Sequence, residues 1–180
     1  MTTPLELPRL ISPTVVLRAF TAADAPPVVE ASTDPLIPLI TTVPASPDAT
    51  SVQAFIDRQR ERAMTGTGYS FAVADAGMDW GMGQIGLWPL GGGRASVGYW
   101  VAPSARGRGV ATSALALISG WGLGLPGLAR LELYVEPWNE GSWRAAEKVG
   151  YQREGLLRSW TQVGDERRDM YMYSLLEQRS

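Results

Sequence analysis

The chain has 180 residues, of which 45% are hydrophobic and 19% charged, and its formal net charge is −2. It contains no cysteine and no histidine, which excludes disulfides, thiolate or imidazole metal sites and catalytic triads built on either residue. It also has no overall basic excess of the kind that nucleic-acid binders carry. We therefore expect a single domain over 1–180, with no metal and no nucleic-acid partner, whose acid–base chemistry uses carboxylates, tyrosine, serine or water.

The sequence gives no sign of a membrane segment or a secretion signal. No apolar run has the length of a membrane span, and the N-terminus lacks a basic stretch followed by an apolar one. A cytoplasmic location without a membrane partner is the default expectation.

The first part of the chain reads as one strand followed by two helices. β-branched residues over 14–20 predict the strand. A helix follows over 21–32, with Thr21 as its N-cap. The segment 34–48 contains four prolines and is expected to be irregular. Apolar residues at helical spacing predict the second helix over 51–64.

The second part has strand patterns, glycine-rich turns and two further helices. We predict three strands (69–75, 82–90 and 95–103), a helix (110–123), a strand (129–135), a helix (139–150) and a final hairpin (151–163 and 167–177). The order β-α-α-β-β-β-α-β-α-β-β predicts an α/β fold with one mixed sheet.

The loop between the fourth strand and the third helix carries Arg-Gly-Arg-Gly at 106–109. The first N–H groups of a helix have no intrahelical partner, and this end of the helix is partly positive. Glycine lets the backbone approach an anion, so phosphate is the usual guest. Arg106 and Arg108 could add charge-assisted bonds. A solvated turn with two surface arginines is the plainer alternative.

Two well-known phosphate loops fit this segment poorly. The P-loop ends in Gly-Lys-Ser/Thr, which is absent here. The dinucleotide fingerprint lacks its third glycine, because Thr112 occupies that place. The loop also lies too late in the chain for a doubly wound fold to follow it.

"RGRGVA" fits the pattern Arg/Gln-x-x-Gly-x-Gly/Ala and resembles the pyrophosphate loop of the GNAT N-acetyltransferases. "VGYWVAPSARGRGVATSAL" resembles the fourth strand and third helix of the RimJ/RimL branch, whose members acetylate protein N-termini or small amines. "LRAFTAADA", "NEGSWRAAEKVGYQREGLLR" and "RRDMYMYSLL" resemble other parts of that branch, so the likeness covers about 17–176. It implies a GNAT fold, with a central, mixed, mostly antiparallel sheet whose fourth and fifth strands splay apart, flanked by helices.

The resemblance implies acetyl-CoA as co-substrate, with its pantetheine arm between the splayed strands. The implied pantetheine contacts are the backbone of Trp100, Val101 and Ala102, together with Asn139. The implied pyrophosphate contacts, mostly backbone N–H groups, are Arg106, Gly107, Arg108, Gly109, Val110 and Ala111, with Thr112 adding a hydroxyl. Trp100 and Val101 also fit plain sheet core, and Asn139 fits a simple helix cap.

Ser142 lies where this branch often has a serine near the departing sulfur, where it would donate a proton or a hydrogen bond. The alternative is a first-turn residue that makes a local backbone bond. Two positions depart from the wider family. Ala146 replaces a tyrosine acid, and Ser96 replaces a strand glutamate. Glu132 and Glu136 remain as candidate bases, although solvent-facing charge is the plainer interpretation of both.

The function that follows is acetyl transfer from acetyl-CoA to a primary amine, either a protein N-terminus or a small molecule, by direct attack in a ternary complex. A cysteine-free chain excludes an acyl-cysteine intermediate. Three alternatives stay open: a non-catalytic acyl-CoA-binding GNAT module, a transferase that uses a longer donor such as succinyl-CoA, and a nucleotide-dependent enzyme.

The acceptor pocket is expected from segment 34–48, the helix after Ser51 and the last hairpin. Trp138, Trp143 and Trp160 lie on or near this side, either as an aromatic wall or as core. The last hairpin could also pair with a second copy in a homodimer.

Overall fold

The computed structural model describes residues 5–177. Its strands are β1 (Leu10–Ile11), β2 (Val15–Arg18), β3 (Tyr69–Asp75), β4 (Gly81–Gly91), β5 (Arg94–Val101), β6 (Arg130–Val135), β7 (Gln152–Val163) and β8 (Glu166–Leu176). Its α-helices are α1 (Ala25–Ser32), α2 (Ile37–Ile40), α3 (Ala49–Met64), α4 (Val110–Leu123) and α5 (Glu140–Val149), with short 3₁₀ turns η1 (Ala22–Asp24) and η2 (Pro103–Ala105).

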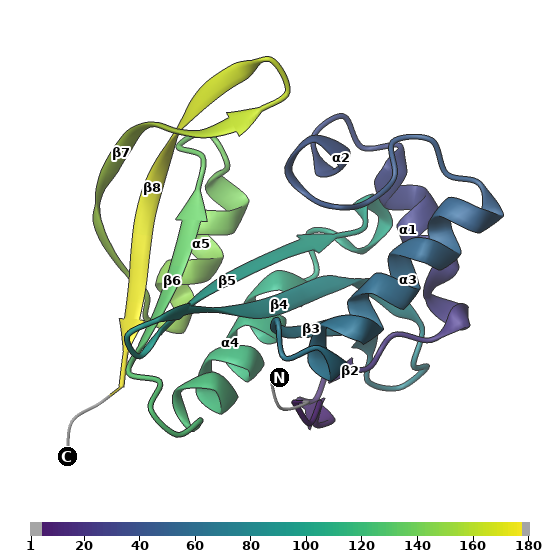
Figure 1. The fold of residues 1–180 in the computed structure, drawn as a ribbon, viewed down its shortest axis with the longest axis horizontal. Coiled ribbons are helices and arrows are strands. Elements are labelled where there is room, and N and C mark those ends of the chain that lie inside the picture. Colours follow the sequence, from purple (N-terminus) through teal and green to yellow (C-terminus); the bar gives the residue numbers. More distant parts are fainter. Residues whose placement is uncertain (1–4, 178–180) are drawn as a thin grey trace.

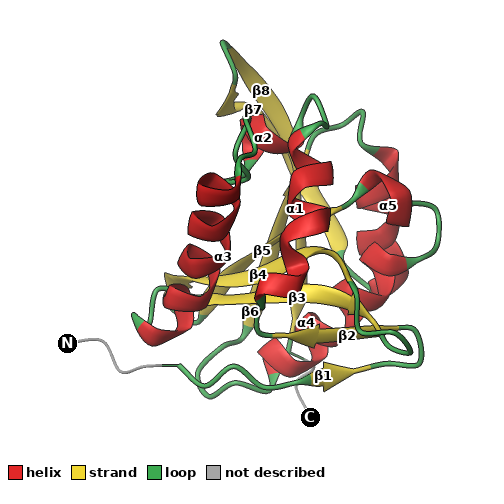
Figure 2. Cartoon of the chain, turned by 90° about the vertical axis from the view of Figure 1, so that its right-hand side faces the viewer, coloured by secondary structure: helices red, strands yellow, loops and turns green. Residues whose placement is uncertain are grey.

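The strands form one sheet in the order β1-β2-β3-β4-β5-β6-β8-β7. All neighbours pair antiparallel except β5 and β6, which run parallel. Helices α1 and α3 cover one face, while α4 and α5 pack on the other (Figures 1 and 2). The predicted mixed, mostly antiparallel sheet flanked by helices is thereby confirmed.

Two elements were missed by the sequence patterns. The two-residue strand β1 pairs with β2 ahead of the first predicted strand, so the expected fourth and fifth strands are β5 and β6. The segment expected to be irregular contains α2. Asp34 starts that turn, because its Oδ1 accepts hydrogen bonds from the backbone N–H groups of Leu36 (2.9 Å) and Ile37 (3.1 Å).

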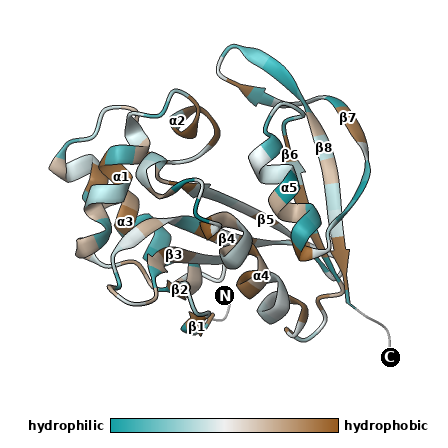
Figure 3. Cartoon of the chain, turned by 180° about the vertical axis from the view of Figure 1, so that it is seen from behind, coloured by the Kyte–Doolittle hydropathy of each residue, from teal (hydrophilic) through white to brown (hydrophobic). Residues whose placement is uncertain are grey.

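The core lies on both faces of the sheet. The larger cluster joins the central strands to α4, where hydrophobic and near-neutral colours predominate (Figure 3). Leu131, Leu133 and Val135 of β6 are all buried in it, because alternate residues of a strand point to the same face of the sheet. The smaller cluster joins α1 and α3 to the opposite face around Phe55 and Trp100.

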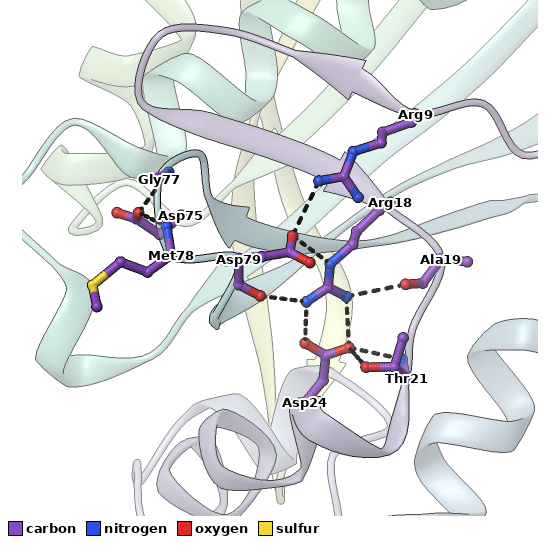
Figure 4. Close-up of polar contacts among 9 residues, drawn as sticks. All are labelled: Arg9, Arg18, Ala19, Thr21, Asp24, Asp75, Gly77, Met78 and Asp79. Carbon is purple, nitrogen blue, oxygen red and sulfur yellow. Dashed lines mark hydrogen bonds and ion pairs between the residues drawn. The ribbon is translucent and has the colours of Figure 1, made fainter.

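Arg18 ties the start of the first helical segment to the β3–β4 turn (Figure 4). Its guanidinium makes two bonds to Asp24 (2.8 and 3.0 Å), two to Asp79 (2.8 and 3.0 Å) and one to the Ala19 carbonyl (3.1 Å). These bonds use all five donors of an arginine. Asp24 also accepts the backbone N–H of Thr21 at 2.8 Å, so the predicted cap at Thr21 is confirmed as a capping box.

β5 and β6 pair over only part of their length. The parallel register runs from Arg94 opposite Arg130 to Val97 opposite Leu133. Beyond that point β5 stays on β4 as far as Val101, and β6 stays on β8 as far as Val135. Each strand is therefore held by its outer neighbour while the two separate from each other, which is visible in Figure 1.

Beyond the point where β5 and β6 separate, the backbone N–H and C=O groups of successive β5 residues point alternately toward β4 and toward the gap. Ala102 donates its N–H to the Met82 carbonyl at 2.8 Å, and the Trp100 carbonyl lies so close to Gly83 that a Cβ built there would be 2.3 Å from its oxygen. The backbone groups of Trp100 and Ala102 therefore face β4, and those of the alternate residues Tyr99 and Val101 face the gap.

This close approach gives a stability prediction. Gly83→Ala should lower the free energy of unfolding by about 1–3 kcal/mol, because the new methyl must push the β5 backbone away. Gly120→Ala is the matched control, since it places a methyl in open space within α4. It should raise stability by about 0.5–1 kcal/mol, because alanine is the better helix former. Equal effects in urea unfolding would contradict the packing described here.

Candidate active site

The glycine loop opens onto the gap at the N-terminus of α4. Gly107 and Gly109 have φ of 75° and 76°, and Gly109 is the N-cap of the helix. A Cβ on either glycine would meet nothing within 4 Å. The loop surface is thus uncovered by protein, and the N–H groups of the first turn of α4 have no acceptor inside the helix.

The two arginines of the loop differ. Arg106 donates to the Val101 carbonyl at 3.1 Å and pairs with Asp34 at 2.7 Å. Partial burial alone would raise the pKa of Asp34, but the backbone N–H of Leu36 and the Arg106 guanidinium outweigh it and hold that pKa below its ordinary value. The Arg106 guanidinium is therefore already engaged by protein groups. The Arg108 side chain, by contrast, is exposed.

A second contact fixes the loop to α1. Ser104 donates its N–H (2.6 Å) and its hydroxyl (2.8 Å) to the two carboxylate oxygens of Glu30. Together with the Asp34–Arg106 pair, this contact holds the loop on the segment that leads into α2.

Helix α5 brings Asn139 and Ser142 to the other side of the gap. Asn139 is the N-cap, and its Oδ1 accepts the Ser142 N–H at 3.2 Å. The Ser142 hydroxyl lies 2.8 Å from the hydroxyl of Tyr99 on β5. This contact joins β5 to the helix that follows β6, and so it bridges the gap between the diverging strands. Burial raises the pKa of Tyr99. Tyr99 was missed in the sequence, where a strand tyrosine between hydrophobic residues fits the core equally well.

Trp100 belongs to a buried polar network under α3. Its indole N–H donates to Gln84 at 2.7 Å, and the Gln84 amide donates to Gln59 at 2.9 Å and Ser70 at 2.8 Å. Trp100 itself is 4% exposed. Its side chain is therefore core, one of the two interpretations left open, and Ala102 offers no free N–H to a ligand because that donor is used by β4.

Glu132 in β6 and Glu136 just after it are both buried, so the plainer interpretation of both as solvent-facing charge is wrong. Glu132 is 1% exposed and bonds Arg94 (3.2 Å), Arg130 (2.9 Å) and the hydroxyl of Tyr134 (2.6 Å). Burial and then the bond to Glu132 raise the pKa of Tyr134 to about 12. Glu136 is 9% exposed, and its carboxylate accepts the indole N–H of Trp138.

Aromatic rings lie on the face of β6 that carries Glu132. Trp160 of β7 stacks on Tyr134, with ring centroids 5.8 Å apart. Trp138 is 55% exposed, whereas Trp143 packs against the core cluster. Trp160 and Tyr134 therefore form a stacked aromatic pair, and Trp143 belongs to the core, which was one of the two interpretations of these tryptophans. The tip of the β7–β8 hairpin reaches α2, because a Cβ on Gly164 would lie 3.7 Å from Leu39.

Comparison with known proteins decides the family. The model of the acetyltransferase (GNAT) domain matches residues 14–152. The chain belongs to the GNAT acetyltransferase family. The resemblance seen in the sequence is therefore confirmed, and the chain is a GNAT-type N-acetyltransferase.

Individual relatives of this GNAT domain agree with that assignment. An uncharacterized N-acetyltransferase p20 from Bacillus licheniformis is 26% identical over 91% of this chain and 93% of its own length. The structure of RimJ from Mycobacterium smegmatis in complex with CoA-disulfide is 26% identical, with a TM-score of 0.76 over 98% of this chain and 90% of that one. A putative ribosomal-protein-serine acetyltransferase from Vibrio cholerae shares the fold, with a TM-score of 0.79 at 22% identity over 98% of this chain and 100% of that one. Within residues 5–177 of the GNAT chain, no helix is both long and apolar enough to cross a membrane.

Proposed function

We propose that this chain transfers the acetyl group of acetyl-CoA to a primary amine inside the gap between β5 and β6. The observation that carries the proposal is the coincidence of two features. The β5–β6 pairing ends at Val97 and Leu133, and the uncovered glycine loop follows at the end of β5. Two substrates can thus meet between the strands, and positioning them supplies most of the rate.

The pyrophosphate of acetyl-CoA binds at the N-terminus of α4 in this proposal. Gly107 and Gly109 admit the phosphates, and the N–H groups of Arg108, Val110, Ala111 and Thr112 donate to them, with the Thr112 hydroxyl in reach. Arg106 positions the loop instead of donating to the phosphates, because its guanidinium is held by Asp34 and its backbone N–H donates to the Pro103 carbonyl at 3.2 Å. The exposed Arg108 supplies the charge-assisted bond.

The pantetheine arm and the acetyl group extend from the loop into the gap. Val101 and Tyr99 offer the backbone groups that face the gap, and Asn139 adds its side-chain amide nitrogen, since its oxygen caps α5. A gap-facing N–H of β5 polarises the thioester carbonyl. Trp100 acts indirectly, because its buried indole fixes the strand on β4.

The amine attacks the thioester carbon, so that a C–N bond forms and the C–S bond breaks. The Ser142 hydroxyl donates its proton or a hydrogen bond to the leaving thiolate, and Tyr99, 2.8 Å away, orients it and can return a proton. The net reaction converts an ammonium and acetyl-CoA into an amide, free CoA and one proton.

Further expectations belong to the same proposal. The chain acts as one domain over 1–180 in the cytoplasm, without a nucleic-acid partner. The acceptor is a protein N-terminus or a small amine, and a homodimer through the last hairpin stays a prediction. A Bacillus subtilis relative named as a putative ribosomal N-acetyltransferase supports the first acceptor class. Failure to turn over any amine would favour a binding module, and faster reaction with succinyl-CoA would favour a longer donor.

Gly109→Leu tests the phosphate loop. The side chain would project into the space proposed for the pyrophosphate, so the KM for acetyl-CoA should rise about tenfold or more. Initial rates of CoA release, followed with a thiol dye that a cysteine-free protein does not consume, measure this change.

Gly127→Leu is the matched control. Gly127 has φ of 77°, also meets nothing within 4 Å and lies in the α4–β6 loop. Both variants lose about 1–2 kcal/mol of stability to left-handed strain, but only Gly109→Leu should change the KM. An equal rise in both variants would contradict the assignment of the loop.

Ser142→Ala tests the proposed proton donor. With any amine that an acceptor screen identifies, kcat should fall at least about tenfold while the KM for acetyl-CoA stays constant. Ser119→Ala is the control, because Ser119 is also hydrogen-bonded to a buried tyrosine, Tyr151, at 2.8 Å. Each variant removes one tyrosine–serine bond, at a cost of about 1 kcal/mol in stability. A similar loss of kcat in both variants would reduce Ser142 to a structural role.

A further inference from the structure

Asp34 uses its two carboxylate oxygens on two different parts of the molecule. Its Oδ1 accepts the backbone N–H groups of Leu36 at 2.9 Å and Ile37 at 3.1 Å, which starts helix α2. Its Oδ2 pairs with the Arg106 guanidinium of the glycine loop at 2.7 Å. The Asp34 side chain is only 9% exposed, and a carboxylate so far from water is stable only with partners of this kind. One side chain therefore joins α2 to the loop that follows β5.

Arg106 carries the connection on to β5. Its Nε donates to the Val101 carbonyl at 3.1 Å, while its Nη2 holds Asp34. Val101 is one of the β5 residues whose backbone groups face the gap. A guanidinium presents its donors in a rigid planar arrangement. The two bonds of Arg106 therefore fix Val101 and Asp34 relative to each other.

Helix α2 depends on its N-terminal contacts more than a longer helix would. It has only four residues, Ile37–Ile40, and a single helical turn is marginal in water without tertiary support. Its exit is held on α3, where Arg58 donates to the Thr42 carbonyl at 3.0 Å. Its start is held by Asp34. A change at Asp34 should therefore alter how often this turn opens.

Helix α2 lies on the side of the gap where the acceptor is expected. It stands beside the tip of the β7–β8 hairpin (Figures 1 and 2), and a Cβ on Gly164 would lie 3.7 Å from Leu39. Leu39 and Ile40 are both about half exposed. Segment 34–48, which contains α2, and this hairpin are parts of the expected acceptor pocket. The contacts of Asp34 and Arg106 thus run from the proposed donor site to the acceptor side.

We propose that Asp34 is a positioning residue that couples acetyl-CoA binding to the order of α2 through Arg106. This inference rests on the acetyl transfer proposed above and adds a link between its two substrate sites. Acetyl-CoA bound at the glycine loop and along β5 restricts the motion of Arg106, which stabilises the Asp34 cap and keeps the turn of α2 closed. The donor-loaded enzyme therefore presents an ordered α2 to the acceptor. Coupling between two sites is reciprocal, so the same pair also strengthens the binding of acetyl-CoA.

Hydrogen exchange in the full-length protein, with and without saturating CoA, tests this coupling. The reporters are the α2 amides that donate to Asp34 or to the Leu36 carbonyl, namely those of Leu36, Ile37, Leu39 and Ile40. In the wild type, CoA should slow their exchange about fivefold or more. Calorimetry on the same samples measures the binding of CoA itself. No binding would overturn the acetyl transfer proposal, whereas binding without slower exchange would overturn only the coupling.

Asp34→Asn separates the ion pair from the helix cap. Asparagine caps helices about as well as aspartate does, but its neutral amide loses the charge-assisted bond to Arg106. CoA should then leave exchange at α2 unchanged, and the Kd for CoA should rise about fivefold or more. Arg106→Gln removes the pair from the other side with the Asp34 cap intact, and we expect the same two results. A CoA effect on α2 that persists in both variants would overturn the proposal.

Glu30→Gln is the matched control. Glu30 also holds the glycine loop, through the N–H and hydroxyl of Ser104 at 2.6 and 2.8 Å, but it lies in α1 and uses both oxygens on Ser104. Glutamine weakens this contact without altering Asp34. The slower exchange of α2 with CoA should therefore persist in this variant. A loss as large as in Asp34→Asn would mean that any loosening of the loop has this effect, and it would overturn the specific role of Asp34.

Discussion

The early end of the β5–β6 pairing is the constraint on which the site depends. Two parallel strands that paired throughout would leave no free backbone groups between them. Here β4 holds β5 as far as Val101 and β8 holds β6 as far as Val135, so the strands part while each stays in a ladder. The glycine loop then follows from β5 and helix α5 from β6, so a candidate anion site lies on one side of the gap and the Tyr99–Ser142 contact bridges it.

Charge is distributed unequally around this gap. Glu132 is neutralised by arginines, and Asp34 holds the loop arginine, so both carboxylates are used within the protein. Glu136 retains an oxygen without a partner. Sequence alone presents these residues as similar acids, yet their partners divide them into two carboxylates that are paired with arginines and one that keeps a buried, unpaired oxygen.

Much of this architecture could be predicted because the decisive signals are local. Strand alternation, the cap at Asn139 and the glycine loop each depend on neighbouring residues, and the order and spacing of several such motifs together indicated the family. The remainder depends on long-range contacts that no local pattern encodes. The short helix at 37–40 forms because Asp34 caps it, the Ala102 N–H is taken by a neighbouring strand, and Tyr99 meets Ser142 from 43 residues away. The burial of Glu132 likewise requires arginines from two strands.

Calorimetric titration of acetyl-CoA into the purified chain tests the central claim most directly, with ADP and NAD as controls. The claim is that the gap and its glycine loop form a site for a CoA thioester. It predicts a Kd on the order of micromolar for acetyl-CoA and much weaker binding of NAD. No heat of binding at millimolar acetyl-CoA would contradict it, because the uncovered N–H groups at the start of α4 would then have failed to hold a pyrophosphate.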